Sequence, residues 1–80
     1  ADNVERLGLP EALTGPVRRG DAVGVGKHLD TLERLSPRLL PIYIAASRTQ
    51  LPLARTLAEA PSSSFDAIEQ ELERRDPASR

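Results

Sequence analysis

The sequence predicts an all-α fold, a small helical bundle, and two observations support this. Apolar residues recur at the three-to-four-residue spacing of helices over most of the 80 residues, and no stretch of useful length alternates as a strand does. The chain has no cysteine and only two aromatic residues, so its core has to be closely packed aliphatic side chains. At this length the chain forms one domain at most and buries roughly 60 % of its surface, which suits a piece of a larger unit.

The first twenty residues are expected to hold the end of a helix and a loop. A short helical signal runs from Asn3 to Leu9, and we interpret it as the tail of a longer helix. Gly15, Pro16 and Gly20 then interrupt regular structure, so residues 13–20 are predicted to form a loop.

Asp21 is predicted to cap a helix over about residues 22–35, because its carboxylate can accept hydrogen bonds from first-turn amides. The apolar stripe of this helix consists of Val25, Leu29, Leu32 and Leu35. Gly24 and Gly26 each cost the helix about 1 kcal/mol relative to alanine, which indicates a close approach by another backbone or a ligand.

Ser36 and Pro37 are typical of a helix start, and the next helix is expected over about residues 37–59. Its broad apolar face comprises Leu39, Leu40, Tyr43, Ile44, Leu51, Ala54, Leu57 and Ala58. Pro52 lies inside this helix and is expected to kink or break it near residues 50–52.

Residues 61–64 are predicted to be a linker, followed by a last helix over 65–75 that Ser63 or Ser64 would cap together with Asp66. Its narrow stripe is Phe65, Ile68 and Leu72, and Glu71 with Arg75 forms a pair one turn apart. The chain thus divides into a helical domain fragment over 1–60, the linker, the last helix and a frayed tail over 76–80.

Bulk properties exclude several classes of protein. The net charge of -1 excludes a strongly basic nucleic-acid binder, and no apolar run approaches the ~18 residues of a membrane span. The sequence has no secretory signal, no phosphate-binding loop, and no ligand set for zinc, since its single histidine has no cysteine to join it. We therefore expect neither nucleic acid nor membrane as a partner, and a cytoplasmic location. The chain begins with Ala1, as a processed or trimmed chain would.

His28 is the candidate catalytic residue. It lies seven residues after Asp21 and four after Gly24, so all three share one face of the predicted helix. An imidazole there could relay a proton or bind a substrate. The commoner role of a single histidine is structural, half-buried and bonded to a neighbouring carbonyl.

Arg18 and Arg19 precede a helix N-terminus, a combination that suits an anion such as phosphate or carboxylate. Asp21 places negative charge at the same spot, so an internal Arg19–Asp21 pair that holds the loop is the stronger alternative. Thr14 can bond to the nearby backbone.

The run from Ala12 to Asp21, with His28-Leu29 and Tyr43 after it, resembles a known family. That family is the C-terminal helical domain of bacterial Rossmann-like oxidoreductase homologues, catalogued as domain of unknown function 2520. Its pattern is ALTGP-x-x-RGD-x-x-T-x-x-x-H-L, followed by a helix with a central tyrosine. Gly24 stands where the family commonly has threonine, which puts any hydroxyl role there in doubt. The resemblance covers about residues 3–58.

The resemblance implies a two-domain protein. An N-terminal Rossmann domain would bind NAD or NADP, and a helical domain similar to those of ketopantoate reductase and 6-phosphogluconate dehydrogenase would form the substrate cleft and a dimer interface. This chain would be the second half of that helical domain, inactive alone and without a cofactor site of its own. We expect Thr14, Arg19 and Asp21 to meet a small anionic substrate beside His28. The alternative is a non-catalytic helical module for protein–protein association.

Overall fold

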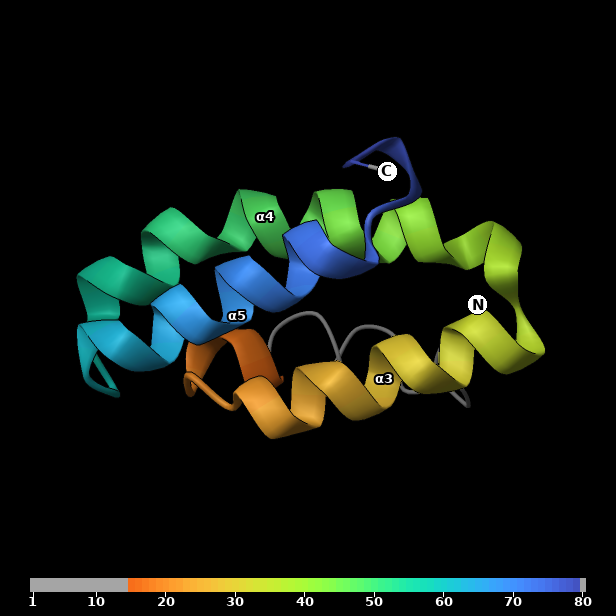
Figure 1. Ribbon diagram of the computed structural model, residues 1–80. Coiled ribbons are helices and arrows are strands. Elements are labelled where there is room, and N and C mark those ends of the chain that lie inside the picture. Colours follow the sequence, from red (N-terminus) through yellow and green to blue (C-terminus); the bar gives the residue numbers. More distant parts are fainter. Residues whose placement is uncertain (1–14, 80) are drawn as a thin grey trace.

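The computed structural model describes residues 15–79, and every regular element in that range is helical. The elements are α3 (Ala22–Leu35), the 3-10 turn η1 (Pro37–Leu39), α4 (Leu40–Leu57), α5 (Ser62–Arg75) and the 3-10 turn η2 (Pro77–Ser79), and residues 15–18 are helical as well. Figure 1 shows α3 and α4 joined through η1 at one end, with α5 returning between them. The predicted all-α bundle is confirmed.

The segment before α3 differs from the predicted loop over 13–20, because residues 15–18 form a helical stretch. Gly20, at φ 70°, ends it. The amide of Gly20 donates to the carbonyl of Val17 at 3.1 Å, and the amide of Asp21 donates to that of Pro16 at 2.8 Å. These two bonds form the motif by which a left-handed glycine closes a helix. Gly20 is therefore a helix terminus, and the next helix begins directly after it.

Asp21 caps α3, as predicted, and its Oδ1 accepts from the amide of Gly24 at 2.9 Å. A Cβ atom on Gly24 would lie 2.5 Å from Asp21 Oδ2, so the close neighbour at this glycine is the capping carboxylate. At Gly26 a Cβ would meet only Glu71 Oε2, at 3.8 Å. No other backbone lies close to either glycine within the described residues, contrary to the predicted close approach.

Helix α4 begins at Leu40, after η1, and ends at Ala58 in a left-handed conformation. It runs through Pro52 without a break, so of the expected kink or break the break is not found. Pro52 and Arg48 are both exposed, so the Arg48 carbonyl that lacks an amide partner can bond to water instead.

Helix α5 begins at Ser62, inside the predicted 61–64 linker. The extended residue Pro61 takes the capping position, and no side chain caps the helix, so the predicted role of Ser63 or Ser64 is wrong. The serines occupy the first turn, where helix amides have no intrahelical partner in any case. Beyond α5, residues 77–79 form η2, with Asp76 Oδ1 accepting from the amide of Ala78 at 3.0 Å.

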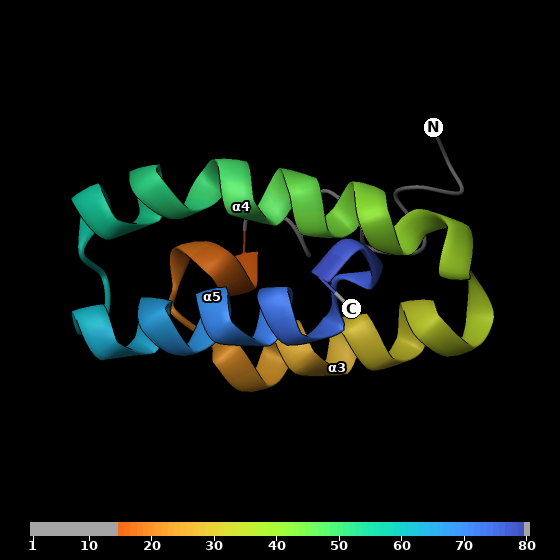
Figure 2. The ribbon, with the colours of Figure 1, turned by 45° about the horizontal axis from the view of Figure 1, so that its top comes forward.

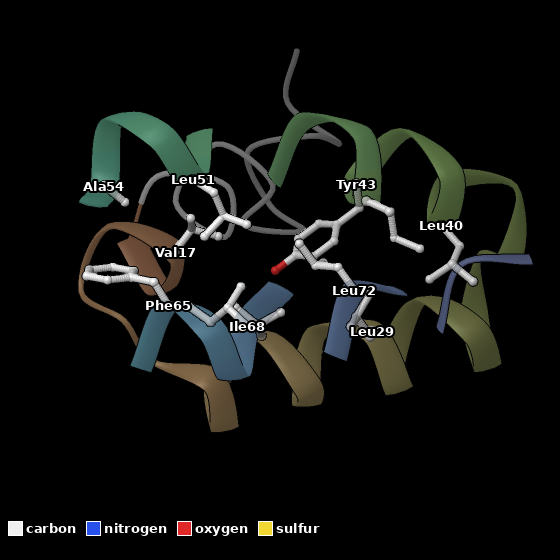
Figure 3. Close-up of a cluster of buried hydrophobic side chains, with 11 residues drawn as sticks. Val17, Leu29, Leu40, Tyr43, Leu51, Ala54, Phe65, Ile68 and Leu72 are labelled. Atoms are coloured by element: carbon white, nitrogen blue, oxygen red, sulfur yellow. The ribbon is translucent and has the colours of Figure 1, made fainter. Parts of the chain in front are cut away.

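The core lies where α5 fits against both other long helices (Figure 2). The predicted stripe Phe65, Ile68 and Leu72 is fully buried and lies in one cluster with Leu29 from α3 (Figure 3). Val25 of α3 belongs to the same cluster. From α4 and the stretch before α3, the core includes Leu40, Tyr43, Ile44, Leu51, Ala54 and Val17. The predicted stripes extend further than the core does, because Leu35 is 66 % and Leu57 49 % exposed.

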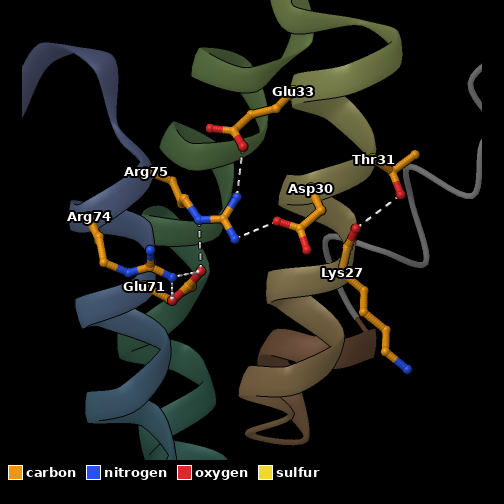
Figure 4. Close-up of polar contacts among 7 residues, drawn as sticks. All are labelled: Lys27, Asp30, Thr31, Glu33, Glu71, Arg74 and Arg75. Atoms are coloured by element: carbon orange, nitrogen blue, oxygen red, sulfur yellow. Dashed lines mark hydrogen bonds and ion pairs between the residues drawn. The ribbon is translucent and has the colours of Figure 1, made fainter.

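A charged cluster on Arg75 fastens the end of α5 to α3 (Figure 4). Its Nη1 donates to Glu33 at 2.9 Å and its Nη2 to Asp30, and the side chain is only 13 % exposed. Its Nε lies 3.0 Å from Glu71 Oε2, which confirms the predicted pair, although the angle is poor for a hydrogen bond. Hydrogen bonding to Asp30 raises the pKa of Arg75, so the cluster always contains its cation.

Candidate functional site

His28 is held against Tyr43, which reaches it from the neighbouring helix. Nδ1 of His28 lies 3.3 Å from the Tyr43 hydroxyl oxygen, and the two rings meet edge to face with centroids 6.0 Å apart. Tyr43 is fully buried, whereas His28 is half-buried. The imidazole is thus fixed by a phenol, and not by the backbone carbonyl that the structural alternative predicted.

Burial raises the pKa of Tyr43 to about 12, so the phenol is neutral at physiological pH. The hydroxyl of Ser47 lies close enough to oppose this rise in pKa, but it makes no hydrogen bond of normal geometry. Among the described residues the Tyr43 hydroxyl therefore makes its only hydrogen bond of normal geometry with Nδ1 of His28. The tautomer of His28 sets the direction of this bond: the phenol donates when Nε2 carries the imidazole hydrogen, and Nδ1 donates when it carries the hydrogen itself. Nε2 itself has no hydrogen-bond partner within residues 15–79.

Ser47 is a polar residue inside the core, one turn after Tyr43 on α4. It is fully buried, and its Oγ makes no hydrogen bond in the described part of the chain. Sequence reasoning missed it, because a single serine on an apolar helix face is not distinctive. The core face of α4 therefore has a polar strip formed by Tyr43 and Ser47.

Two of the predicted substrate residues, Arg19 and Asp21, lie in the described range and have different surroundings. The carboxylate of Asp21 is bonded to the amide of Gly24. Arg19 is exposed, and its guanidinium lies over Gly15, where an added Cβ would be 3.0 Å from Nη1. No ion pair joins Arg19 to Asp21 in the described range, so that predicted pair is wrong. The Asp21 carboxylate is held at the first turn of α3 by helix capping, whereas Arg19 lies before the left-handed turn at Gly20 with its guanidinium over Gly15.

Two other predicted features fall elsewhere. Thr14 lies outside the described residues. Arg18 approaches Glu59, with Nε and Oε2 3.7 Å apart, and both side chains are about half exposed. Of the predicted site, the structure therefore connects Asp21 and His28 through α3 and adds Tyr43 from α4.

Among the hollows on the surface of the described residues are two that His28 does not line. One, of about 170 Å³, lies along α4 and is almost wholly apolar, and it is formed by Arg18, Gln50, Leu53, Ala54 and Leu57. The other, of about 380 Å³, lies between α3 and α5 and is formed by Ala22, Val23, Ala67, Gln70, Glu71 and Arg74.

Within residues 15–79 no cluster of three or more His, Cys, Asp or Glu side chains could hold a metal ion. None of the described helices has the length and apolarity to cross a bilayer.

The His28–Tyr43 pair was not predicted, although a signal for it exists. Tyr43 was placed on the apolar face of its helix, and a buried tyrosine usually finds a hydrogen-bond partner for its hydroxyl. His28 is the only histidine and lies on an inward-facing helix. The two conditions together point to the pair.

The chain matches a known protein family. The model of a family described as a domain of unknown function (DUF2520) matches residues 1–50, more than half of the chain. The matched range includes Asp21, His28 and Tyr43. No curated protein and no solved structure matches the chain.

Proposed function

The chain belongs to the family described as a domain of unknown function (DUF2520), and on this basis we propose that it is the helical, substrate-facing domain of an NAD(P)-dependent oxidoreductase. The observation that supports this most directly is the hydrogen bond between His28 and Tyr43. Both residues lie in the matched range, and the bond leaves one imidazole nitrogen without a partner among the described residues. An anionic substrate near Arg19 and a cytoplasmic setting, where nicotinamide dinucleotides are available, belong to the same proposal.

The chemistry assigned to His28 is proton transfer at Nε2. A carbonyl that is reduced to an alcohol takes up a proton on its oxygen, and an imidazolium can donate it. In the reverse direction Nε2 would accept that proton in the neutral tautomer that carries its hydrogen on Nδ1 and donates it to the Tyr43 oxygen. Tyr43 would act as a positioning residue, because its buried phenol fixes the ring but its pKa of about 12 keeps it protonated.

The residues described here do not fit a nicotinamide dinucleotide. Residues 15–79 hold helices only, and the sequence has no glycine-rich GxGxxG turn to approach a pyrophosphate. In this proposal the cofactor and its Rossmann domain therefore belong to another part of the same protein.

Cofactor binding by the full parent protein tests the proposal. We expect saturable enhancement of NADPH fluorescence with the protein encoded by the complete reading frame, and none with the 80-residue chain alone. A complete protein that binds neither NADPH nor NADH would refute the oxidoreductase function.

Kinetics of variants of the complete protein then test the site. His28→Asn should lower kcat/KM by about 100-fold or more, the usual contribution of a general acid. Tyr43→Phe should have a smaller effect and should shift the pH profile, whereas Arg19→Ala should mainly raise KM. Lys27→Ala, an exposed neighbour of His28, is the matched control. Native kcat/KM in His28→Asn would show that the histidine is structural.

The rival function, a non-catalytic association module, also has an observation in its favour. Ile42 and Leu53 on α4 are 58 % and 61 % exposed, and apolar side chains gathered on one exposed face are typical of an interaction site. A complete protein that associates with itself but binds no nicotinamide cofactor would support this alternative.

A further inference from the structure

Ser47 differs from the other hydroxyl residues that lie beyond the first turn of a described helix. Thr31, Thr49 and Thr56 each donate to the carbonyl four residues earlier, at 3.0, 2.9 and 3.0 Å. Ser47 makes no such bond although it is fully buried, and its Oγ has no hydrogen-bond partner within residues 15–79. An unpaired hydroxyl in a core is costly, because it loses its bonds to water and gains none in return. The helix backbone therefore leaves this hydroxyl available to another side chain.

The phenol of Tyr43 is the side chain that Ser47 can serve. The two residues are one turn apart on the core face of α4, and the Ser47 hydroxyl lies close enough to oppose the rise in the pKa of Tyr43. Figure 3 shows the Tyr43 oxygen on the side of its ring toward Leu51, and Ser47 lies between these two residues on the same face. No hydrogen bond of normal geometry joins the two hydroxyls in this structure, in which the phenol is bonded to Nδ1 of His28.

The phenol needs a second partner whenever Nδ1 of His28 carries a hydrogen. With the imidazole hydrogen on Nε2, the phenol donates to Nδ1 and its own hydrogen is satisfied. In the imidazolium and in the other neutral tautomer, Nδ1 donates to the phenol oxygen, so the phenol hydrogen has to find a different acceptor. The phenol also keeps this hydrogen at physiological pH, because burial raises the pKa of Tyr43 to about 12. Within residues 15–79, the Oγ of Ser47 is a buried oxygen beside the phenol that has no partner of its own.

We propose that Ser47 accepts the hydroxyl hydrogen of Tyr43 in those states in which Nδ1 of His28 is a donor. Ser47 is then a positioning residue for proton transfer at Nε2, a consequence that rests on the proposed function. When the imidazolium gives its Nε2 proton to a carbonyl oxygen, the Nδ1 hydrogen stays bonded to the phenol oxygen and the phenol hydrogen stays bonded to Ser47. Nε2 then regains a proton from water. The two hydrogen bonds in series hold the ring in one orientation throughout this cycle.

Charged groups around α3 leave the His28 ring to its hydrogen bond. Because an α-helix turns once in roughly 3.6 residues, Asp30 and Glu33 lie on the side of α3 away from His28. Asp21, two turns earlier, caps the helix, and Lys27 is exposed. The charged residues of the elements packed against α3 are Arg38 of η1, Arg48 and Arg55 of α4, and Asp66, Glu69, Glu71, Glu73, Arg74 and Arg75 of α5. None of them forms an ion pair with His28 within residues 15–79. Removal of the Ser47 hydroxyl therefore changes the hydrogen bonding of the ring without changing a charge.

An NMR titration of the chain tests the proposal, because His28 is the only histidine and its ring signals cannot be confused with others. In Ser47→Ala the imidazolium loses the acceptor for the phenol hydrogen, whereas the neutral ring with its hydrogen on Nε2 loses nothing. The titration midpoint of the ring should therefore move to lower pH by about one unit, the scale of one unsatisfied buried donor. The nitrogen chemical shifts of the neutral ring should show more of the tautomer with its hydrogen on Nε2. In the complete protein, the limb of the kcat/KM profile that reports this ring should move by the same amount.

Two controls separate this role from a general effect on the core. Thr49→Ala removes an exposed hydroxyl of the same helix, one that is bonded to the Ala45 carbonyl, and should leave the midpoint unchanged. In a chain that already carries Tyr43→Phe, Ser47→Ala should no longer move the midpoint, because the phenol that connects the two residues is gone. Circular dichroism checks that each variant stays helical, and Ser47→Ala introduces the residue that favours a helix most.

An unchanged midpoint and tautomer in Ser47→Ala would overturn the proposal and show that Ser47 is only a small residue of the core. Equal shifts with and without the Tyr43 hydroxyl would overturn it as well, since the effect would not pass through the phenol. Both results leave the oxidoreductase proposal standing, because the titration requires no cofactor. Conversely, the expected shift in a protein that binds neither NADPH nor NADH would support the role of Ser47 in hydrogen bonding and refute the oxidoreductase function.

Discussion

Arg75→Ala should destabilise the fold strongly, whereas Arg74→Ala should not. The two arginines are adjacent and both interact with Glu71. Arg74 is 65 % exposed and, within residues 15–79, bonds only inside α5. Arg75 is 13 % exposed and connects α5 to Asp30 and Glu33 on α3. The pair therefore separates a contact between helices from one within a helix.

The magnitude follows from the three contacts of Arg75. An exposed ion pair contributes about 0.2–1 kcal/mol, and Asp30, at 64 % exposure, belongs near the low end. Glu33 and Glu71 are 38 % and 19 % exposed, and they belong nearer the upper end. With the packing of the arginine stem added, the loss is about 2 kcal/mol. A chain of 80 residues has a stability of about 4–12 kcal/mol, so this is a substantial fraction.

Urea unfolding followed by helical circular dichroism measures both variants. We expect Arg75→Ala to lower the unfolding free energy by about 2 kcal/mol and Tm by about 8–16 °C. Arg74→Ala should change the unfolding free energy by less than about 0.5 kcal/mol. Equal losses in the two variants would show that the contacts to α3 add nothing to the intrahelical pair.

Three further predictions concern single positions. Tyr43 is the only tyrosine, so absorbance at 295 nm should show one titration near pH 12. Because the folded pKa of Tyr43 exceeds the ordinary value of 10, the unfolding free energy should be intact below pH 10 and fall by about 2–3 kcal/mol between pH 10 and 12. Tyr43→Phe should abolish this dependence of stability on pH. Gly20→Ala should lower the unfolding free energy by about 2–4 kcal/mol, because Gly20 is left-handed and a Cβ there would lie 2.6 Å from the Cβ of Ala60. The control Gly26→Ala should be neutral or stabilising, and equal effects of the two substitutions would contradict this reasoning. Hydrogen bonds from the Ala78 amide and from Arg48 lower the pKa of Asp76. The stability that Asp76 contributes to the fold is therefore present above about pH 4 and is lost on further acidification. Asp76→Asn should flatten that part of the acid-unfolding curve.

Local features of the fold were predictable because they depend on near neighbours in the sequence. Asp21 as a cap and the stripe of Phe65, Ile68 and Leu72 required only the spacing of residues along one helix. The helix end at Gly20 was predictable in principle, since a glycine directly before an aspartate cap suits two helices in succession. The prediction of a loop there gave the glycine and proline too much weight as interruptions.

Tertiary features were not predictable from spacing. Leu35 belongs to an apolar stripe yet is exposed, because the burial of α3 depends on where α5 crosses it. The contact between Arg75 and Asp30 spans 45 residues, and that between His28 and Tyr43 joins two helices. Periodicity assigns each residue to a face, but the relative rotation of the helices decides which faces meet.

The central position of α5 has a consequence for biosynthesis. Phe65, Ile68 and Leu72 are fully buried against helices that precede them in the chain. When residues 22–57 leave the ribosome, the apolar faces of α3 and α4 have no α5 to cover them. Until residues 62–75 emerge, this nascent chain exposes the surface that chaperones recognise, so a ribosomal pause within α5 would prolong its exposure to aggregation.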